Sequence, residues 1–281
     1  MKNVLIFGGS SYIAKQFASY VKNHDVKINT TLVSSRGSGW RKVNFAKYDA
    51  VLYCAGVAHV KERPQMAPLY NRVHAKLALE VAQKSKVCGV KQFVYISTMA
   101  VYGNDRIVDE KTIPSPTSLY GKSKLKGEEW LKLLGSKKFA ICIVRPPMVY
   151  GPGCKGNFPR LVKLAKWLPV FPKIENKRSM IFVDNLSEYI VQAVLSGKGG
   201  IGLPQNAQYV NTTNLVVLIA SINGKTMATT AFFNPLIGLF SKFVPQFDKL
   251  FGSLVYETSC TKKYNVVPFA KGVIASLCYK P

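Results

Sequence analysis

Tyr120 and Lys124 are four residues apart in the run Tyr120-Gly121-Lys122-Ser123-Lys124. In a helix, residues i and i+4 lie one turn apart on the same face. A free tyrosine titrates at a pH of about 10, which is too high for a base at neutral pH, but a neighbouring ammonium stabilises the phenolate and lowers that value. The pair therefore indicates acid/base chemistry at Tyr120, assisted by the charge of Lys124.

The spacing alone is weak evidence, because a chain with this many tyrosines and lysines contains roughly 1.5 such pairs by chance. The position of the pair is more informative. The pair follows an apolar strand pattern over residues 92–97, which leads into Thr98. Doubly wound sheets bind ligands at the carboxyl ends of their strands. A Thr98 hydroxyl at that edge can bind a substrate oxygen and relay its proton to Tyr120. The alternative is that Thr98 only caps a helix or closes a turn.

A second candidate site is the turn that follows the apolar run Val4 to Phe7. Gly8, Ser11 and Ala14 have the spacing of a dinucleotide-binding turn in which small residues replace two of the three glycines. Small residues let the backbone approach a pyrophosphate, and the N-terminus of the following helix, expected over residues 12–22, presents free N–H groups to it. The alternative is a tight turn that only leads into a helix.

The second strand pattern ends in Ser34, Ser35 and Arg36, where NAD-binding chains usually have an acidic residue. Arginine forms paired hydrogen bonds with phosphate oxygens, and hydroxyls suit the same group. We therefore expect NAD(P) as the cofactor and favour NADP. The alternative is that Arg36 only stacks on adenine, in which case either cofactor binds.

Strand patterns over residues 29–34, 50–54, 92–97 and 139–144 alternate with helical patterns over residues 67–86 and 119–134. This alternation predicts an α/β fold with a Rossmann-type doubly wound parallel sheet. Only about 15 residues link the second strand to the third, so a crossover helix is missing there or reduced to a turn. We expect a dinucleotide-binding Rossmann domain over residues 1–150. Residues 151–281 should form a smaller substrate-binding lobe, with some chain returning to the Rossmann core.

The chain has a formal net charge of +25, from 39 Lys and Arg against 14 Asp and Glu. This charge suits an anionic partner, or it belongs to solvated surfaces, which the even spread of the lysines favours. No nucleic-acid-binding motif accompanies it, so we expect no nucleic-acid partner. The apolar run over residues 231–247 is either a membrane-surface helix or a helix packed on the core, and its interrupting prolines favour packing.

Compartment and metal content follow from simpler features. The six cysteines include no CxxC pair, so we expect neither a disulfide framework nor a metal site. No apolar run approaches the ~18 residues of a membrane span, and the apolar start breaks at Gly8-Gly9, too early for a signal peptide. We therefore expect a cytoplasmic protein.

In combination, five motifs resemble the extended short-chain dehydrogenase/reductases, and within them the UDP-glucose 4-epimerase-like NAD-dependent epimerase/dehydratase family. The likeness extends over nearly the whole chain. The motifs lie at residues 7–14, 54–60, 95–103, 120–124 and 145–153.

This resemblance implies roles for individual residues. Thr98, Tyr120 and Lys124 take the catalytic positions, and Asn71 takes a helix position that steadies the active-site sheet. The substrate's nucleotide diphosphate would meet Asn157, Phe158 and Arg178, whereas Asp184 is a helix cap rather than a ligand. We expect the cofactor to contact Gly8, Ser10, Ser11, Tyr12, Ile13, Arg36, Ala55, Gly56, Lys124 and Pro146.

The chain departs from the family pattern at the glycine turn, at Arg36 and at Met148, which stands where many epimerases have an asparagine facing the sugar. The expected function is a nucleotide-sugar epimerase, acting on a UDP-hexose or UDP-N-acetylhexosamine by transient oxidation at C4, in the synthesis of surface polysaccharide precursors. The alternative is an NADPH-dependent reductase of 4-keto nucleotide sugars. A dehydratase is disfavoured because Met99, not a carboxylate, follows Thr98. Peripheral association with an anionic membrane and a homodimer stay open.

Overall fold

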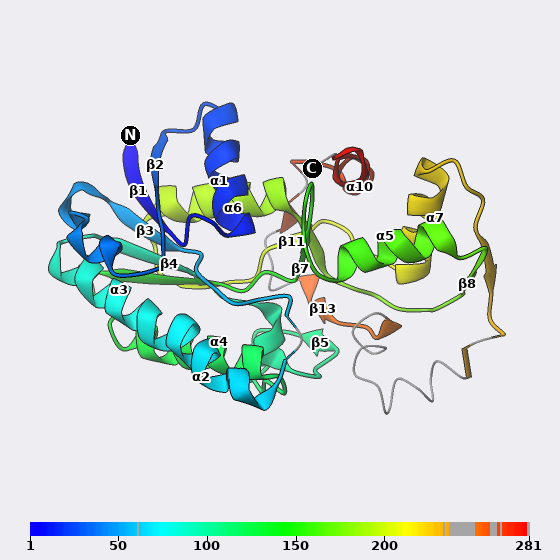
Figure 1. The fold of residues 1–281 in the computed structure, drawn as a ribbon, viewed down its shortest axis with the longest axis horizontal. Coiled ribbons are helices and arrows are strands. Elements are labelled where there is room, and N and C mark those ends of the chain that lie inside the picture. Colours follow the sequence, from blue (N-terminus) through cyan, green and yellow to red (C-terminus); the bar gives the residue numbers. More distant parts are fainter. Residues whose placement is uncertain (61, 233, 236–250, 259–262, 265, 280–281) are drawn as a thin grey trace. The chain divides into compact units, whose positions relative to one another are not determined.

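The computed structural model of the chain describes residues 1–60, 62–232, 234–235, 251–258, 263–264 and 266–279. The chain divides into two compact units (Figure 1). Unit 1 comprises Met1–Asn104, Thr112–Pro147 and Val183–Pro204, and unit 2 comprises Asp105–Lys111, Met148–Phe182 and Gln205–Pro281. The chain therefore returns to unit 1 through Val183–Pro204, and it contributes a short early segment to unit 2 that the sequence did not lead us to expect.

Unit 1 is built on a six-stranded sheet in the order β2-β1-β3-β4-β6-β10, with all neighbours parallel. The strands are β1 (Lys2–Phe7), β2 (Ile28–Val33), β3 (Ala50–Tyr53), β4 (Gln92–Ile96), β6 (Ala140–Val144) and β10 (Gly200–Gly202). This order confirms the predicted doubly wound fold. Because β2 and β3 flank β1 on opposite sides, the strand order reverses between β1 and β3, where such sheets bind ligands.

Helices cover both faces of this sheet, which is why its central strands are apolar throughout. Figure 1 shows α1 (Tyr12–Asn23) and α6 (Val183–Ser196) on one face, and α2 (Ala67–Asn71), α3 (Leu77–Val87) and α4 (Leu119–Lys132) on the other. Every residue of β3 and β4 is buried. Between β2 and β3 the chain forms only two short 3-10 turns, Gly39–Lys42 and Phe45–Lys47, as the short link predicted.

The π-helical turn Arg72–Lys76 joins α2 to α3, and α4 packs against it. Gly127 makes this close approach possible. A Cβ atom at Gly127 would lie 2.3 Å from the carbonyl oxygen of His74 and 2.8 Å from the hydroxyl of Tyr95. The packing therefore holds α4 close against the π-helical turn at Gly127.

Unit 2 has its own core, which includes Tyr150, Phe158, Phe171 and Phe182. Its helices are α5 (Asn157–Trp167), α7 (Thr212–Ile222) and α10 (Phe269–Cys278). Its strands form parallel pairs: β5 (Ile107–Val108) with β13 (Val255–Tyr256), β7 (Met148–Tyr150) with β9 (Met180–Phe182), β8 (Val170–Pro172) with β12 (Ala228–Thr230), and β11 (Gln205–Asn206) with β14 (Lys263–Tyr264).

Most of the apolar run over residues 231–247 lies outside the described residues, so its two interpretations stay predictions. Among the helices that the structure does describe, none combines the length and the apolar character that a membrane crossing requires.

Replacing Gly127 with alanine should destabilise unit 1, because the new methyl group would meet the backbone carbonyl of His74. We expect the free energy of unfolding to fall by about 1–3 kcal/mol, although alanine favours the helix itself by up to about 1 kcal/mol. Urea denaturation measures the change. Gly39→Ala is the matched control, since a Cβ atom at Gly39 has no neighbour within 4 Å. Equal stability of the two variants would contradict this packing.

Candidate active site

The turn after β1 has a backbone that only glycine tolerates at Gly8. Its φ is 88°, and a Cβ atom there would lie 2.5 Å from the backbone nitrogen of Ala55. Ser11 caps α1, because its side-chain oxygen accepts the N–H of Ala14 at 3.3 Å. The first turn of α1, which is fully described, has no acidic residue to offset the positive end of the helix dipole. This turn can therefore receive an anionic group.

The other residues that we expect to contact a cofactor also lie in unit 1, on the segments that follow β1, β2, β3 and β6. Arg36 is exposed, and its backbone N–H donates to the hydroxyl of Ser34 at 3.1 Å. The carbonyl of Pro146 accepts the N–H of Met99 at 2.9 Å, which joins the loops after β4 and β6. These other residues are Ser10, Tyr12, Ile13, Arg36, Ala55, Gly56 and Pro146.

Thr98, Tyr120 and Lys124 lie together in unit 1. Tyr120 and Lys124 are one turn apart near the N-terminus of α4, which Ser118 caps by accepting the N–H of Gly121 at 3.0 Å. The Thr98 side chain lies near the Tyr120 hydroxyl, where hydrogen bonding favours the phenolate. The Lys124 ammonium lies 6.0 Å from the centre of the Tyr120 ring. Thr98 also caps the following 3-10 turn, because its hydroxyl accepts the N–H of Ala100 at 3.2 Å, whereas its expected role as a proton relay stays a prediction.

Burial controls the protonation of this group. The Lys124 ammonium is buried and donates to the carbonyl of Ile96 at 2.8 Å, and burial lowers the pKa of Lys124 to about 8. Burial raises the pKa of Tyr120 to about 12, against the opposing effect of the Thr98 hydrogen bond. Part of the Tyr120 side chain is exposed, but protein surrounds its hydroxyl closely. The expected lowering of this pKa is therefore wrong for the chain by itself, because burial outweighs the nearby charge.

Glu128, one turn beyond Lys124 on α4, is a charged residue with no exposed surface. The Nε atom of Arg145 donates to both of its carboxylate oxygens at 3.1 Å, and the hydroxyl of Ser97 also donates to it. Arg145 in turn donates to the hydroxyl of Tyr102 at 2.6 Å. Sequence reasoning missed this pair, although Glu128 continues the face of the helix that carries Tyr120 and Lys124.

His74, in the π-helical turn, is also fully buried. The backbone N–H of Val57 donates to its Nε2 at 2.9 Å, and its Nδ1 lies 2.8 Å from the hydroxyl oxygen of Ser123. The rings of His74 and Tyr120 make an edge-to-face contact, with 5.3 Å between their centres. His74 therefore connects the loop after β3 to α4, a role that the sequence did not indicate. The role proposed for Asn71 stays a prediction.

Glu62 holds the same loop to the start of α4. Its carboxylate accepts the backbone N–H groups of Leu119 and Tyr120, each at 3.2 Å. These are unpaired N–H groups of a helix N-terminus, where an anion is favourable. The loop after β3 is therefore attached to α4 at two points, one through His74 and one through Glu62.

The residues expected to bind the nucleotide diphosphate belong to unit 2. Asn157 begins α5. The ring of Phe158 is buried and stacks on Tyr150 with 5.3 Å between ring centres, so this side chain is part of the core and only its backbone can reach a ligand. Arg178 is largely buried, and its guanidinium donates to the carbonyl of Gly252 at 2.7 Å. Asp184 lies in the first turn of α6, in unit 1, and burial raises its pKa.

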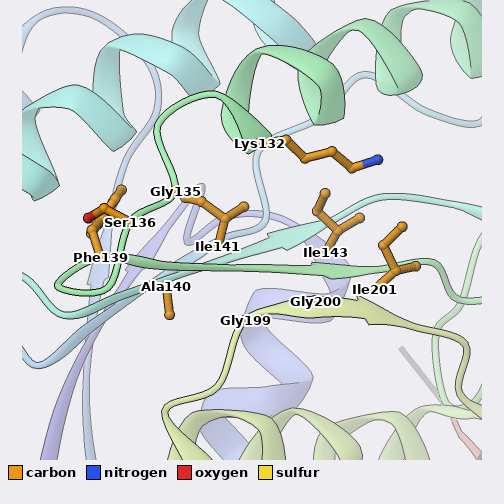
Figure 2. Close-up of a pocket in the computed structure, with 10 residues that line it drawn as sticks. All are labelled: Lys132, Gly135, Ser136, Phe139, Ala140, Ile141, Ile143, Gly199, Gly200 and Ile201. Atoms are coloured by element: carbon orange, nitrogen blue, oxygen red, sulfur yellow. The ribbon is translucent and has the colours of Figure 1, made fainter.

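Figure 2 shows a cavity of about 330 Å³ in unit 1. It lies along β6 and β10, next to the C-terminal end of α4, and Lys132 is the one charged residue among the side chains that line it. Thr98, Tyr120 and Lys124 do not line it. The cavity therefore has none of the acid/base groups described above.

Comparison with known proteins identifies the family of this chain. The sequence pattern of the NAD dependent epimerase/dehydratase family matches residues 4–202, which include every candidate residue above. A UDP-glucose 4-epimerase of Vibrio cholerae is 30% identical over 219 residues, which cover 74% of this chain and 67% of that protein. The chain belongs to the NAD dependent epimerase/dehydratase family.

Solved structures of similar fold include an epimerase and a reductase. The UDP-glucuronic acid 4-epimerase of Bacillus cereus, in complex with NAD, has a TM-score of 0.73 at 16% identity, covering 99% of this chain and 96% of that one. The dTDP-4-dehydrorhamnose reductase of Bacillus anthracis, in complex with NADP, has a TM-score of 0.73 at 18% identity, covering 99% of both chains. At these identities the likeness establishes the fold alone.

The stability of unit 1 should fall as the pH drops below 6.5, because of His74. Burial, and then the charge of Lys124, lower the pKa of His74 from 6.5 to about 2. Between pH 6.5 and about 2, only the unfolded chain binds a proton at His74. The neutral, folded His74 therefore makes its full contribution to the free energy of unfolding above pH 6.5. Below 6.5 it falls by up to about 1.4 kcal/mol per pH unit. The other titratable groups that face His74 are Tyr70, Tyr95 and Tyr120, which stay neutral throughout this range.

Urea denaturation of the wild type and of His74→Gln, between about pH 7 and about pH 5, measures this contribution. The variant should lose less stability on acidification than the wild type. His24→Gln, the same change at an exposed histidine of the same unit, is the matched control. Parallel curves for the wild type and His74→Gln would show that His74 does not stay neutral in the folded chain.

Proposed function

We propose that this chain is a nucleotide-sugar 4-epimerase that acts on a UDP-hexose or UDP-N-acetylhexosamine, in the synthesis of surface polysaccharide precursors. The observation that carries the proposal is the group at the carboxyl end of β4, where the hydroxyls of Thr98 and Tyr120 lie near the buried ammonium of Lys124. Family membership and the similarity to a UDP-glucose 4-epimerase support it.

The segments around this group fit a nicotinamide dinucleotide. Gly8 keeps the turn after β1 close to Ala55, and the N-terminus of α1 suits a pyrophosphate. A Cβ atom at Gly56 would lie 3.4 Å from Nε2 of His74 and 3.7 Å from Nζ of Lys124, so glycine keeps the approach to the ammonium open. When bound here, a nicotinamide would supply the acceptor and then the donor of the hydride at C4 of the sugar.

Tyr120 is the acid/base residue of the proposed reaction. It receives the proton of the C4 hydroxyl through the hydroxyl of Thr98 while the sugar is oxidised, and it returns a proton when the 4-keto sugar is reduced. Lys124 supplies positive charge beside the phenolate and holds the nicotinamide ribose. In unit 2 we assign the nucleotide diphosphate to Asn157, the backbone of Phe158 and Arg178, whose donors complement phosphate oxygens.

A second candidate, an NADPH-dependent reductase of 4-keto nucleotide sugars, is favoured by the segment after β2. Arg36 is exposed there beside Ser34 and Ser35, with no carboxylate in the run. A guanidinium and two hydroxyls suit the 2′-phosphate of NADP better than the free ribose hydroxyls of NAD. The catalytic residues of the two reactions are the same.

We place this reaction in the cytoplasm. The described cysteines are all free thiols, which suits a reducing compartment. The net charge of +25 also motivates a test of binding to anionic membranes, with vesicle flotation as the measurement.

Tyr120→Phe should lower kcat by a factor on the order of 10²–10⁴, because it removes the proton-transferring hydroxyl. The assay incubates the protein with a panel of UDP-sugars and follows absorbance at about 340 nm, where reduced nicotinamide absorbs, together with product stereochemistry. Conversion without net cofactor change identifies an epimerase, and stoichiometric loss of NADPH identifies a reductase. Tyr48→Phe, outside the site, serves as control. Near-normal turnover by Tyr120→Phe would refute the catalytic assignment.

Arg36→Asp should weaken NADP binding by about tenfold or more, since a charged hydrogen bond to phosphate is lost and a repulsive charge is added. Binding of NAD should change little. Fluorescence titration with NADPH and NADH measures both affinities. Arg106→Asp, an exposed position in unit 2, makes the same charge change away from the turn. An unchanged ratio of affinities in Arg36→Asp would exclude the phosphate role.

A further inference from the structure

His74 lies where three elements of unit 1 meet. Its backbone carbonyl accepts the hydroxyl of Tyr95, from β4, at 2.8 Å. Its imidazole contacts the loop after β3 through Val57 and contacts α4 through Ser123. The side chain has no exposed surface, so each polar atom of the ring must be satisfied by the protein.

The partners of this ring determine where its proton lies. The backbone N–H of Val57 can only donate, so Nε2 of His74 accepts. A neutral imidazole has one acceptor and one donor, so Nδ1 carries the proton and donates to the hydroxyl oxygen of Ser123. The hydroxyl of Ser123 then donates to the backbone carbonyl of Tyr120 at 2.9 Å. A backbone donor at one end and a backbone acceptor at the other fix the direction of every hydrogen bond between them.

We propose that His74 is a positioning residue that fixes the distance between the cofactor-binding loop after β3 and the first turn of α4, which carries Tyr120. This inference rests on the proposed function, because it takes the loop after β3 as a cofactor contact and Tyr120 as the acid/base residue. The ring also supports Tyr120 directly, through the edge-on contact between the two rings. Gly56 belongs to the same arrangement, since a side chain there would press on Nε2 of His74.

The chain of hydrogen bonds requires a neutral imidazole, because a second ring proton would leave the Val57 N–H facing another donor. Burial and the charge of Lys124 both oppose that proton. Lys124 therefore has two effects: it places charge beside Tyr120 and keeps His74 in the form that bridges the loop and the helix.

The bridge formed by His74 consists of its hydrogen bonds to Val57 and to Ser123, and two substitutions test these bonds separately. The amide of glutamine reaches the position of Nε2, whereas the amide of asparagine reaches only the position of Nδ1. His74→Gln should keep the bond to Val57 and lose the bond to Ser123, so kcat should fall about tenfold or more while cofactor affinity stays within about twofold. His74→Asn should keep the bond to Ser123 and lose the bond to Val57, so cofactor affinity should fall about fivefold or more.

Cofactor affinity is measured by fluorescence titration and kcat by the UDP-sugar assay, with His24→Gln as the control for the same change at an exposed position. A residue that only supports the fold would give the two variants the same pattern, and that result would overturn the proposal. Ser123→Ala should reproduce the kcat loss of His74→Gln, and the double variant should show no further loss. Additive losses would also overturn it.

Nitrogen-15 NMR of the wild type tests the bridge without any variant of His74 and without turnover. The chain has three histidines, so His24→Gln and His59→Gln assign the His74 signals by difference. We expect a neutral ring protonated at Nδ1 down to about pH 5. Protonation at Nε2, or titration near pH ~6.5, would refute the bridge even if Tyr120→Phe behaves as proposed. Normal turnover by Tyr120→Phe would instead remove the proposed function and leave the NMR result standing.

Discussion

Glu128 carries a charge at a position with no exposed surface, and the neighbouring elements of unit 1 supply the groups that compensate it. Arg145, at the end of β6, forms the ion pair, and Ser97, at the end of β4, adds a hydrogen bond. Removing one partner of a buried pair typically costs about 3–5 kcal/mol, because the other charge is left without a partner. The pair therefore fixes α4 against the carboxyl ends of β4 and β6. Thr98 directly follows Ser97, and Lys124 precedes Glu128 by one turn, so the candidate catalytic group takes its geometry from this contact.

The same region contains two buried cations, Lys124 and Arg145, and one buried anion, Glu128. Burial, and then the charge of Lys124, keep His74 neutral although it is a base. Burial also lowers the pKa of Lys124, but Cys54 and Glu128 oppose this effect, so a pKa of about 8 leaves Lys124 mostly protonated at neutral pH. Burial of these groups needs close packing, and Gly127 provides it by letting α4 approach the carbonyl of His74. Electrostatics and packing therefore impose one arrangement on this part of unit 1.

Much of the fold could be predicted from the sequence because it is encoded locally. Apolar runs and their spacing located β1, β2, β3, β4 and β6 to within two residues, but not β10 or the short strands of unit 2. The short link before Ala50 left too little chain for a crossover helix. His74 was missed because resemblance pointed to Asn71, although Tyr70, Leu77 and Val81 define a buried helix face that includes position 74. Glu62 joins a loop to a helix 57 residues later, which no local pattern predicts. The raised pKa of Tyr120 depends on how much protein surrounds its hydroxyl, which residue spacing does not encode.

That pKa bears on the direction of the chemistry. With a pKa of about 12, Tyr120 keeps its proton at neutral pH, so the proton is present for donation and the phenolate base is scarce. Reduction of a 4-keto group needs the donor, whereas oxidation of a C4 hydroxyl needs the phenolate and so more positive charge within ~4–6 Å. Lys124 alone does not reverse the effect of burial. In the proposed reaction, Tyr120 would act as a base beside an oxidised, positively charged nicotinamide and as an acid beside the reduced one. An epimerase would use both states of Tyr120 in each turnover and a reductase only one. The two proposed reactions therefore differ in whether the 4-keto sugar is formed on the enzyme or supplied as substrate, not in the residues that transfer the proton.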